Sequence, residues 1–364
     1  TPLRIDLPDK RYADCFYSSL NYMLLMKTGK ELWPGPRNYR SFFLHDAVDM
    51  TEALDKAGLA GAVRDSLDVF HFREGDGYLD ATGGCAYALY SHYLLTKDRD
   101  YLEAVYPRIM ENAARIQALR AVRSRAPFEG TELFGLMPPS VSQDNFKLRA
   151  HLYLDNWWGV IGLRTAGLAA AELGKTSEST GYFAASRSYL ADVLRSIGAV
   201  MKRDGASSMP SFADYWPPEN RVVDGDHRLL GATQQAWAHR PALCPGNTLG
   251  LEIPRDLFRT SYELYWKEAC RLSAEEGAWF VEYEGVFWGY NVLLARPLVF
   301  LGMNDIALSN AEWSVRNPSC PGGWCEAMNS RVNSQGKREL AEGIIIGDVP
   351  HGWSAAHYVL LLRE

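Results

Sequence analysis

The residues best suited to chemistry lie near the end of the sequence, in a long stretch rich in Gly and Pro. It presents Glu326 beside Trp324 and leads directly into the last apolar helix. Asp348, His351 and Trp353 stand at the entrance of that helix. A carboxylate, aromatic rings and a histidine on a loop before a buried helix are typical of a binding or catalytic site.

The rest of the chain consists of helices that would position such loops. Helical periodicity dominates, convincing strand alternation is scarce, and roughly twelve helices are expected. The helices that start near 46, 83, 155, 288 and 351 are apolar nearly all round, as buried helices are, whereas the others carry charges on one face. The expected helices span 12–28, 46–57, 60–72, 83–96, 100–122, 155–173, 177–201, 257–275, 288–301, 304–315 and 351–363, with a short one inside the irregular stretch 204–250.

This alternation of inner and outer helices predicts an all-α fold, an (α/α)6 barrel or toroid of six helical hairpins. The long loops all precede inner helices, so we expect them to gather at one mouth of the barrel. The composition does not change along the chain, which favours a single catalytic domain over residues 1–364.

Composition and charge exclude several partners. The formal net charge of −6 is spread without blocks, whereas a nucleic-acid surface needs a basic stripe. No run approaches the ~18 apolar residues that cross a bilayer, so neither nucleic acid nor a membrane is expected. The chain opens with Thr-Pro-Leu-Arg and no signal peptide, which leaves a processed secreted protein or a piece of a longer one. Extracellular, periplasmic or cytoplasmic location and the oligomeric state stay open.

The six cysteines are too few for a disulfide scaffold. Cys320 and Cys325 are close enough in sequence to pair in an oxidising compartment. The others lie in or beside apolar stretches and are expected to be buried free thiols: Cys15, Cys85, Cys244 and Cys270.

Several motifs resemble those of six-hairpin glycosidases, among them bacterial glucoamylase-like enzymes. The segment Arg40-Ser-Phe-Phe-Leu-His-Asp46 is similar to a Trp-x-Arg-Asp pattern whose Arg-Asp pair binds the non-reducing sugar. Asp46 matches it, and His45 takes the place of the arginine. The other similar motifs, which together cover nearly the whole chain, are Gly77-Tyr-Leu-Asp80-Ala-Thr-Gly-Gly, His92-Tyr-Leu-Leu-Thr-Lys-Asp98, Gly135-Leu-Met-Pro138, Leu154-Asp155-Asn-Trp-Trp158 and Gly347-Asp-Val-Pro-His351-Gly-Trp353.

The resemblance implies a glycosidase that acts on an oligo- or polysaccharide, with inversion and without a metal or other cofactor. Inverting enzymes use one carboxyl group as general acid and a second as general base. In six-hairpin hydrolases the base lies in the loop before the twelfth helix, which here contains Glu326 and Glu342. Glu326 follows Gly-Gly-Trp-Cys and is the expected base, while Glu342 is more typical of a structural residue.

The general acid is less clearly marked. Glucoamylase-like members place a glutamate after the Trp that opens the sixth helix, but here Trp158 is followed by Gly159. Asp155 is the nearest carboxylate and our first candidate. It is also a natural N-cap, and a helix N-terminus favours the charged form, which opposes the raised pKa that an acid needs. The alternatives in the same loop are Glu129, Glu132 and Asp144.

Other residues before inner helices could bind the sugar. Asp46 and Asp80 would accept hydrogen bonds from hydroxyl groups, or else cap their helices. His351 could orient a carboxylate or bind a hydroxyl group, or act as a cap. The aromatic residues that could stack on sugar rings, or else belong to the core, are Trp157, Trp158, Trp324 and Trp353.

Four other functions are compatible with such a barrel. Cys320, Cys325 and His351 offer the ligand types of a zinc enzyme similar to lantibiotic cyclases. His351 and His357 could serve a sugar epimerase, since epimerases use paired histidines for proton transfer. An unsaturated glycuronyl hydrolase would rely on one aspartate. A carbohydrate-binding domain without activity would explain the missing glutamate after Trp158.

Overall fold

The computed structural model describes residues 3–71, 78–142, 149–215, 231–279 and 285–364. Within these ranges the chain forms twelve α-helices and five short strands, as the predominance of helical periodicity predicts. It divides into two compact units. Unit 1 comprises Thr1–Phe70 and Tyr265–Glu364, and unit 2 comprises His71–Leu264. The single domain over 1–364 stays a prediction.

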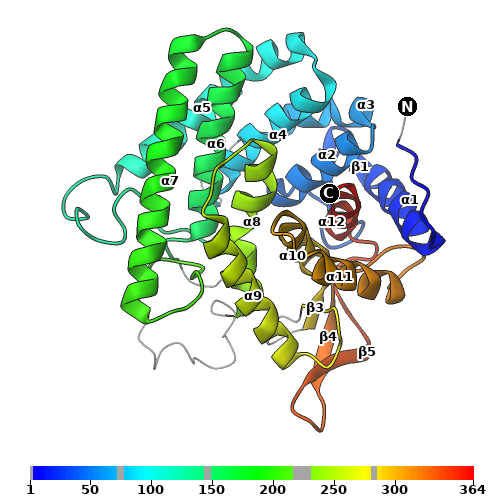
Figure 1. The fold of residues 1–364 in the computed structure, drawn as a ribbon. Coiled ribbons are helices and arrows are strands. Elements are labelled where there is room, and N and C mark those ends of the chain that lie inside the picture. The colour runs from blue at the N-terminus through cyan, green and yellow to red at the C-terminus, as the bar shows by residue number, and fades with distance from the viewer. Residues whose placement is uncertain (1–2, 72–77, 143–148, 216–230, 280–284) are drawn as a thin grey trace. The chain divides into compact units, whose positions relative to one another are not determined.

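The helices of unit 2 are α4 (Ala81–Thr96), α5 (Arg99–Ala121), α6 (Tyr153–Glu172), α7 (Thr176–Asp204), α8 (Ala232–Thr248) and most of α9 (Arg255–Leu272). Helix α6 is buried on nearly every side and packs against α4, α5, α7 and α8, with α7 alongside it (Figure 1). Helix α4 can approach α6 closely because Gly83 has no side chain. A Cβ at Gly83 would collide with the backbone of Trp158.

The helices of unit 1 are α1 (Lys10–Leu25), α2 (Leu44–Lys56), α3 (Ala60–Val63), the 3₁₀-helix η1 (Ser66–Val69), the end of α9, α10 (Trp288–Phe300), α11 (Asn304–Arg316) and α12 (Gly352–Arg363). Helix α12 is buried over most of its length and packs against α1, α2 and α10. Unit 1 also contains two small antiparallel sheets. One pairs β1 (Lys27–Thr28) with β2 (Glu31–Leu32), and the other has the order β3 (Gly285–Phe287), β4 (Ala327–Val332), β5 (Arg338–Ile346).

A buried ionic cluster joins α2, α10 and the end of α12. Arg296 on α10 donates to Glu364 at 3.0 and 2.6 Å and lies 3.6 Å from Asp49 and 3.8 Å from Glu52. Lys56 lies 2.8 Å from Glu52 and 3.3 Å from Glu364. Removing one partner of a buried ion pair leaves an uncompensated charge and is strongly destabilising, so the cluster holds these helices in one arrangement.

The helix predicted over 60–72 is wrong. The chain forms only the four-residue α3 and the four-residue η1 there. Leu67 and Phe70, which are three residues apart as on one helix face, are both buried. Asp65 lies between the two short helices and pairs with Lys27 at 2.9 Å, and aspartate is a weak helix former.

The stretch 204–250 was predicted to be irregular apart from one short helix, but it contains the 17-residue α8. A proline inside a helix removes a backbone hydrogen-bond donor, and this stretch contains Pro241 and Pro245. Both lie inside α8, which is buried along most of its length, so packing outweighs the lost hydrogen bonds. Residues 216–230 of this stretch lie outside the described residues.

The stretch 317–350, predicted to be a long loop, contains strands β4 and β5. The pairing has a register shift between Met328 and Ser330, so the sequence shows no regular alternation, and Gly336 with φ +75° lies in the turn. The hairpin projects away from the helices of unit 1 (Figure 1). Glu326 therefore stands immediately before a strand, β4, rather than in the middle of a long loop.

Candidate active site

The carboxylate of Glu326 meets a tyrosine that sequence reasoning missed. The phenolic oxygen of Tyr39 lies 2.8 Å from both carboxylate oxygens of Glu326 and donates to them. Both side chains are half-buried. A donated O–H favours the ionised carboxylate, which is the form that a general base needs. The only signal for Tyr39 was its place beside the motif at 40–46.

A second carboxylate of unit 1, that of Asp348, accepts backbone N–H groups. The donors are Arg37 at 3.1 Å, Asn38 at 2.8 Å and Tyr39 at 3.0 Å. Burial raises the pKa of Asp348, but these donors outweigh burial and lower it below its usual value. The backbone carbonyl of the same residue accepts the N–H of Glu326 at 3.1 Å.

His351 is buried and neutral. Burial lowers the pKa of its imidazole to about 3. Its ring lies edge-on to that of Tyr39, with centroids 5.6 Å apart. It occupies the N-cap position of α12 but makes no side-chain cap hydrogen bond, so capping does not account for it. A neutral imidazole here can exchange hydrogen bonds without adding charge.

Trp353, in the first turn of α12, is held from several sides. Its indole N–H donates to Asp49 of the ionic cluster at 3.2 Å. A Cβ at Gly289 would collide with its ring, so the ring lies against the backbone of α10. Tyr290 and His357 contact it edge-on, with centroids 5.3 and 4.8 Å away. With these contacts, residue Trp353 is 8% exposed.

His45 and Asp46 lie in the first turn of α2, and both are half-buried. The N-cap of α2 is Phe43, without a side-chain cap hydrogen bond, so Asp46 does not occupy the capping position. Both residues stay candidates for sugar binding.

Trp324 was predicted to form an aromatic wall beside the base, and this role is corrected. The residue is 2% exposed, its indole N–H donates to the carbonyl of Ser314 at 2.9 Å, and its ring packs on Tyr358 with centroids 4.6 Å apart. A ring enclosed in this way belongs to the core of unit 1 and has no face free for a sugar.

In unit 2 the central carboxyl group is that of Asp155, which is fully buried on α6. Burial and the neighbouring Asp80 raise the pKa of Asp155 to about 7. The cap of α6 is Leu152, one turn earlier, so Asp155 does not cap the helix. The expected lowering by the helix N-terminus is therefore outweighed by burial and by the second carboxyl group, and the objection to Asp155 as an acid is removed.

Two serines connect Asp155 with the segment that carries Asp80. The hydroxyl of Ser140 donates to Asp155 and lies 3.1 Å from that of Ser142. The Ser142 hydroxyl accepts the N–H of Leu79 at 2.8 Å. Asp80 is the N-cap of α4 but makes no side-chain cap hydrogen bond, so a structural cap does not explain it. Sequence reasoning missed both serines, whose only signal was their place after two prolines.

The two described alternatives for the acid have less suitable surroundings. Glu132 is engaged in an ion pair with Arg203 at 2.5 Å, and Glu129 is exposed. Asp144 lies outside the described residues.

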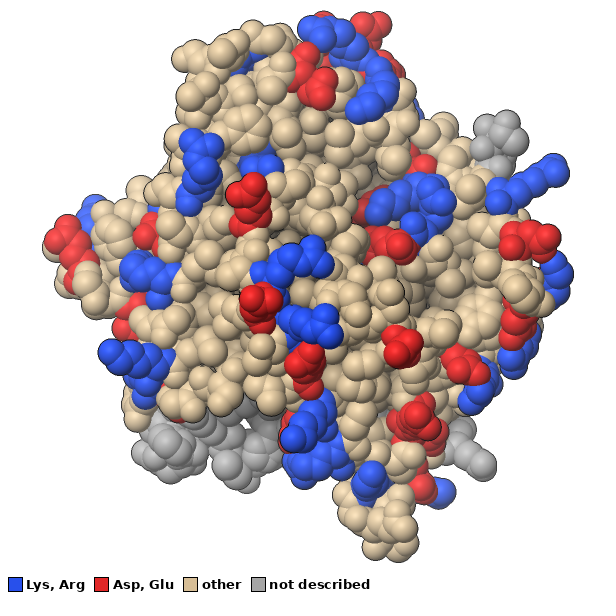
Figure 2. Space-filling view, in the orientation of Figure 1, with Lys and Arg blue, Asp and Glu red and all other residues tan. Residues whose placement is uncertain are grey.

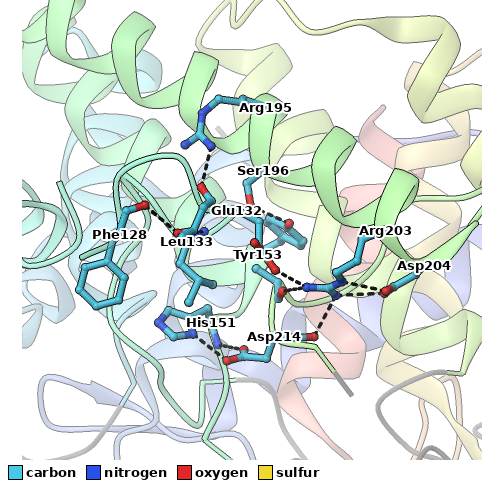
Figure 3. A network of polar contacts seen from close by, with 12 residues as sticks. Phe128, Glu132, Leu133, His151, Tyr153, Arg195, Ser196, Arg203, Asp204 and Asp214 are labelled. Atoms are coloured by element: carbon cyan, nitrogen blue, oxygen red, sulfur yellow. Dashed lines mark hydrogen bonds and ion pairs between the residues drawn. The ribbon is translucent and has the colours of Figure 1, made fainter. Parts of the chain in front are cut away.

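A network of polar contacts attaches the loop before α6 to the end of α7 (Figure 3). Arg203 of α7 donates to Glu132 of the loop, to Asp204 at 2.8 Å and to the carbonyl of Asp214 at 3.2 Å. Asp214 accepts from the backbone N–H of His151 at 2.6 Å, and its carboxylate lies 2.9 Å from the His151 ring. The loop that carries the serines is thus fixed on both sides.

Trp157 and Trp158, predicted to stack on sugars, also pack in the core. The indole N–H of Trp157 donates to Nδ1 of His239 at 2.9 Å, and this ring is fully buried. Trp158 is 4% exposed and packs on Tyr87, with centroids 5.9 Å apart. Both stacking roles are corrected, because the rings are enclosed by unit 2 itself.

The described residues contain no group of three or more His, Cys, Asp or Glu side chains placed to hold a metal ion. All six cysteines are free thiols, so the predicted possibility of a Cys320–Cys325 bridge is not realised. Cys270, predicted to be buried, is exposed, because it lies on the outer face of α9.

The visible face of the molecule carries Lys and Arg interspersed with Asp and Glu, without a continuous basic stripe (Figure 2). No helix in the described part of the chain is both long and apolar enough to span a bilayer.

Comparison with known proteins gives matches in structure alone. No family model and no curated protein matches the chain. A glycosidase structure matches with a TM-score of 0.66 and 14% identity, over 97% of this chain and 96% of that one. A rhamnosidase from Klebsiella oxytoca with rhamnose bound matches with a TM-score of 0.58 and 12% identity, over 99% of this chain and 65% of that one. An α-1,6-mannanase from Salegentibacter matches with a TM-score of 0.56 and 11% identity, over 97% of each chain.

At these identities the likeness shows the fold. The chain has the all-α six-hairpin fold of these glycosidases, which confirms the (α/α)6 class predicted from the alternation of its helices.

Proposed function

We propose that this chain is a glycoside hydrolase that cleaves an oligo- or polysaccharide with inversion, with Glu326 as general base and Asp155 as general acid. The observation that carries the proposal is the contrast between two carboxyl environments. Asp155 is fully buried with its pKa raised to about 7, whereas Glu326 is half-buried and accepts a hydrogen bond from a phenol. Environments that separate two carboxyl groups in this way assign the acid and the base.

As general base, Glu326 takes a proton from the water that attacks the anomeric carbon. The O–H of Tyr39 stabilises the charged carboxylate before the reaction and fixes its orientation. Orientation matters because the attacking water must be held in line with the bond that breaks. His351 borders Tyr39 as a neutral group, so it does not compete as a charged partner.

As general acid, Asp155 donates its proton to the leaving oxygen. A pKa of about 7 leaves a large fraction of this carboxyl group protonated near neutral pH, and such a match of pKa to pH is what efficient proton transfer requires.

At Gly159, where glucoamylase-like enzymes carry their acid, neighbouring side chains leave no space for a larger residue. A Cβ at Gly159 would already collide with the side chains of Tyr189 and Met137, so a glutamate does not fit there without repacking. Asp155 lies four residues earlier in α6, and residues four apart share one face of a helix. In this proposal the general acid thus lies about one helical turn before the position that it has in glucoamylase-like enzymes.

A carbohydrate substrate is supported by the structural neighbours, one a rhamnosidase with rhamnose bound and one an α-1,6-mannanase. The residues that we propose for binding hydroxyl groups and the sugar ring are His45, Asp46, Asp80, His351 and Trp353.

The test is hydrolysis of a broad panel of glycans and glycosides by the wild type, Glu326→Gln and Asp155→Asn. General acid–base groups contribute about 10²–10⁴-fold in rate, so both variants should lose at least ~10²-fold on natural glycosides. Fluoride leaves a glycosyl fluoride without being protonated. On glycosyl fluorides the hydrolysis rate of Asp155→Asn should therefore approach that of the wild type, whereas the rate of Glu326→Gln should stay low. Proton NMR of the first product should show the inverted anomer.

Asp98→Asn is the matched control. The Asp98 carboxylate caps α5 by accepting the N–H of Tyr101 at 3.0 Å, and Asp98 is not one of the residues proposed for the active site. Equal losses of the two variants on fluorides and natural glycosides would refute the assigned roles. Isomerisation of a sugar would favour the epimerase. Hydration of an unsaturated uronide would favour the glycuronyl hydrolase. Binding without turnover would favour the non-catalytic domain.

A further inference from the structure

One residue of unit 1 contacts the backbone of both Tyr39 and Glu326. The carboxylate of Asp348 accepts the N–H of Tyr39 at 3.0 Å, and its carbonyl accepts the N–H of Glu326 at 3.1 Å. Two further N–H groups, those of Arg37 and Asn38, point at the same carboxylate. The backbone of residues 37–39, which ends at the tyrosine itself, is thus bound through Asp348 to the segment that carries the base.

The local sequence leaves room for this arrangement. A Cβ at Gly35 would collide with the carboxyl group of Asp348. Gly347 has φ +72°, and a Cβ there would collide with the side chain of Glu326. Two glycines thus let the chain approach each carboxylate closely, one of them in a backbone conformation that favours glycine.

Three backbone N–H donors converge on the one carboxylate of Asp348. The segment 36–39 is largely exposed, yet the carboxylate that it surrounds is buried, with Asp348 2% exposed. Hydrogen bonds to a charged group are stronger than those between neutral groups. A buried charge directed at an exposed segment therefore holds that segment, and with it the hydroxyl of Tyr39, in one place.

We infer that Asp348 is a positioning residue that sets the hydrogen bond between Tyr39 and Glu326, and through it the charge state and orientation of the base. The inference rests on the proposed function for its catalytic part. Asp348 acts through the backbone of residues 37–39, whose N–H groups donate to its carboxylate.

The test compares Asp348→Asn, Tyr39→Phe and the double variant. An asparagine keeps one acceptor oxygen and the volume, but replaces the other oxygen with a donor that faces N–H groups. We expect kcat to fall at least ~10-fold in each single variant, with KM within about threefold. The acidic limb of the pH–rate profile should move to higher pH by the same amount in both. The double variant should be no slower than the slower single variant.

Two readouts do not need activity. With ¹³C-labelled glutamate, NMR should show the titration midpoint of Glu326 rising equally in Asp348→Asn and Tyr39→Phe. Hydrogen exchange should show lost protection of the amides of 37–39 in Asp348→Asn and not in Tyr39→Phe. Asp98→Asn, which also removes a carboxylate that accepts a backbone N–H, should change neither.

The outcomes separate the two proposals. Loss of 37–39 protection and a shifted Glu326 titration, in a protein that hydrolyses no glycoside, would keep the positioning role and reject the proposed function. An unchanged Glu326 titration in Asp348→Asn, or additive losses in the double variant, would overturn the positioning role. Thermal unfolding of every variant verifies that the comparison is made on folded protein.

Discussion

The hydroxyl of Tyr39 lies 2.8 Å from both carboxylate oxygens of Glu326, although 287 positions separate the two residues in the chain. The contact joins the segment before α2 to the start of β4. It provides a donor for a charged carboxylate at a place where the sequence indicated only a flexible, glycine-rich loop. The first prediction tests what that donor contributes.

Removing the Tyr39 hydroxyl should weaken catalysis without unfolding the protein. A hydrogen bond to a charged group is worth roughly 1.5–3 kcal/mol, so Tyr39→Phe should lower kcat/KM by about 10–100-fold. Because the donor favours the ionised carboxylate, its loss should move the acidic limb of the profile upward. Tyr17→Phe is the control, since the Tyr17 hydroxyl contacts only the backbone of Ile5 in the described contacts. Steady-state rates from pH 4 to 9 measure both effects, and equal rates for the two variants would contradict the prediction.

Asp155→Asn should change how stability depends on pH. Burial and Asp80 raise the pKa of Asp155 from 3.8 to about 7. Between these values the folded state holds a proton that the unfolded state releases, so wild-type stability falls as pH rises through this window. Asparagine has no such proton. Each pKa unit corresponds to about 1.4 kcal/mol, so the variant should gain on the order of 4 kcal/mol relative to wild type from pH 4 to 8.

Urea unfolding of Asp155→Asn and wild type at several pH values measures this difference. Asp98→Asn should show no comparable gain. A difference between Asp155→Asn and wild type that does not vary with pH would show that the buried carboxyl group has an ordinary pKa.

His239→Gln should make the protein less sensitive to acid. Burial lowers the pKa of His239 to about 4, while the hydrogen bonds of its ring to Trp157 and the Pro210 carbonyl suit the neutral form. As pH falls from 6.5 to 4, His239 becomes protonated in the unfolded chain but stays neutral in the folded protein. Stability is therefore present above pH 6.5 and lost below it, by up to about 3 kcal/mol at pH 4.

The variant loses two hydrogen bonds and should be less stable at pH 7, but its stability should fall less between pH 6.5 and 4. Unfolding free energies at these pH values measure the slope, with exposed His71→Gln as control. Parallel slopes for wild type and His239→Gln would refute the prediction.

Two glycine-to-alanine changes should act in opposite directions. Gly35→Ala places a Cβ in collision with the Asp348 carboxyl group and should destabilise by about 1–3 kcal/mol. Gly198→Ala lies in the interior of α7, where a Cβ meets nothing within 4 Å, and should stabilise by roughly 0.5–1 kcal/mol. Denaturant midpoints compare the two, and equal effects would show that the space at Gly35 does not matter.

The sequence by itself determined the helical class and the order of inner and outer helices. Apolar residues around the whole circumference of α6 and α12 could only be buried, and charges on one face of α7 could only be exposed. These are properties of residues close in sequence, so periodicity reveals them.

Tertiary structure alone decided which side chains meet. Tyr39 with Glu326, and Ser140 with Asp155, are contacts whose geometry depends on how segments fold onto one another. The raised pKa of Asp155 needs both burial and Asp80, 75 residues earlier in the chain. Helix α8, with two prolines inside, and the hairpin of β4 and β5 are likewise stabilised by packing and pairing that outweigh local propensity. No local pattern carries that information, because the free energy of these contacts comes from distant residues.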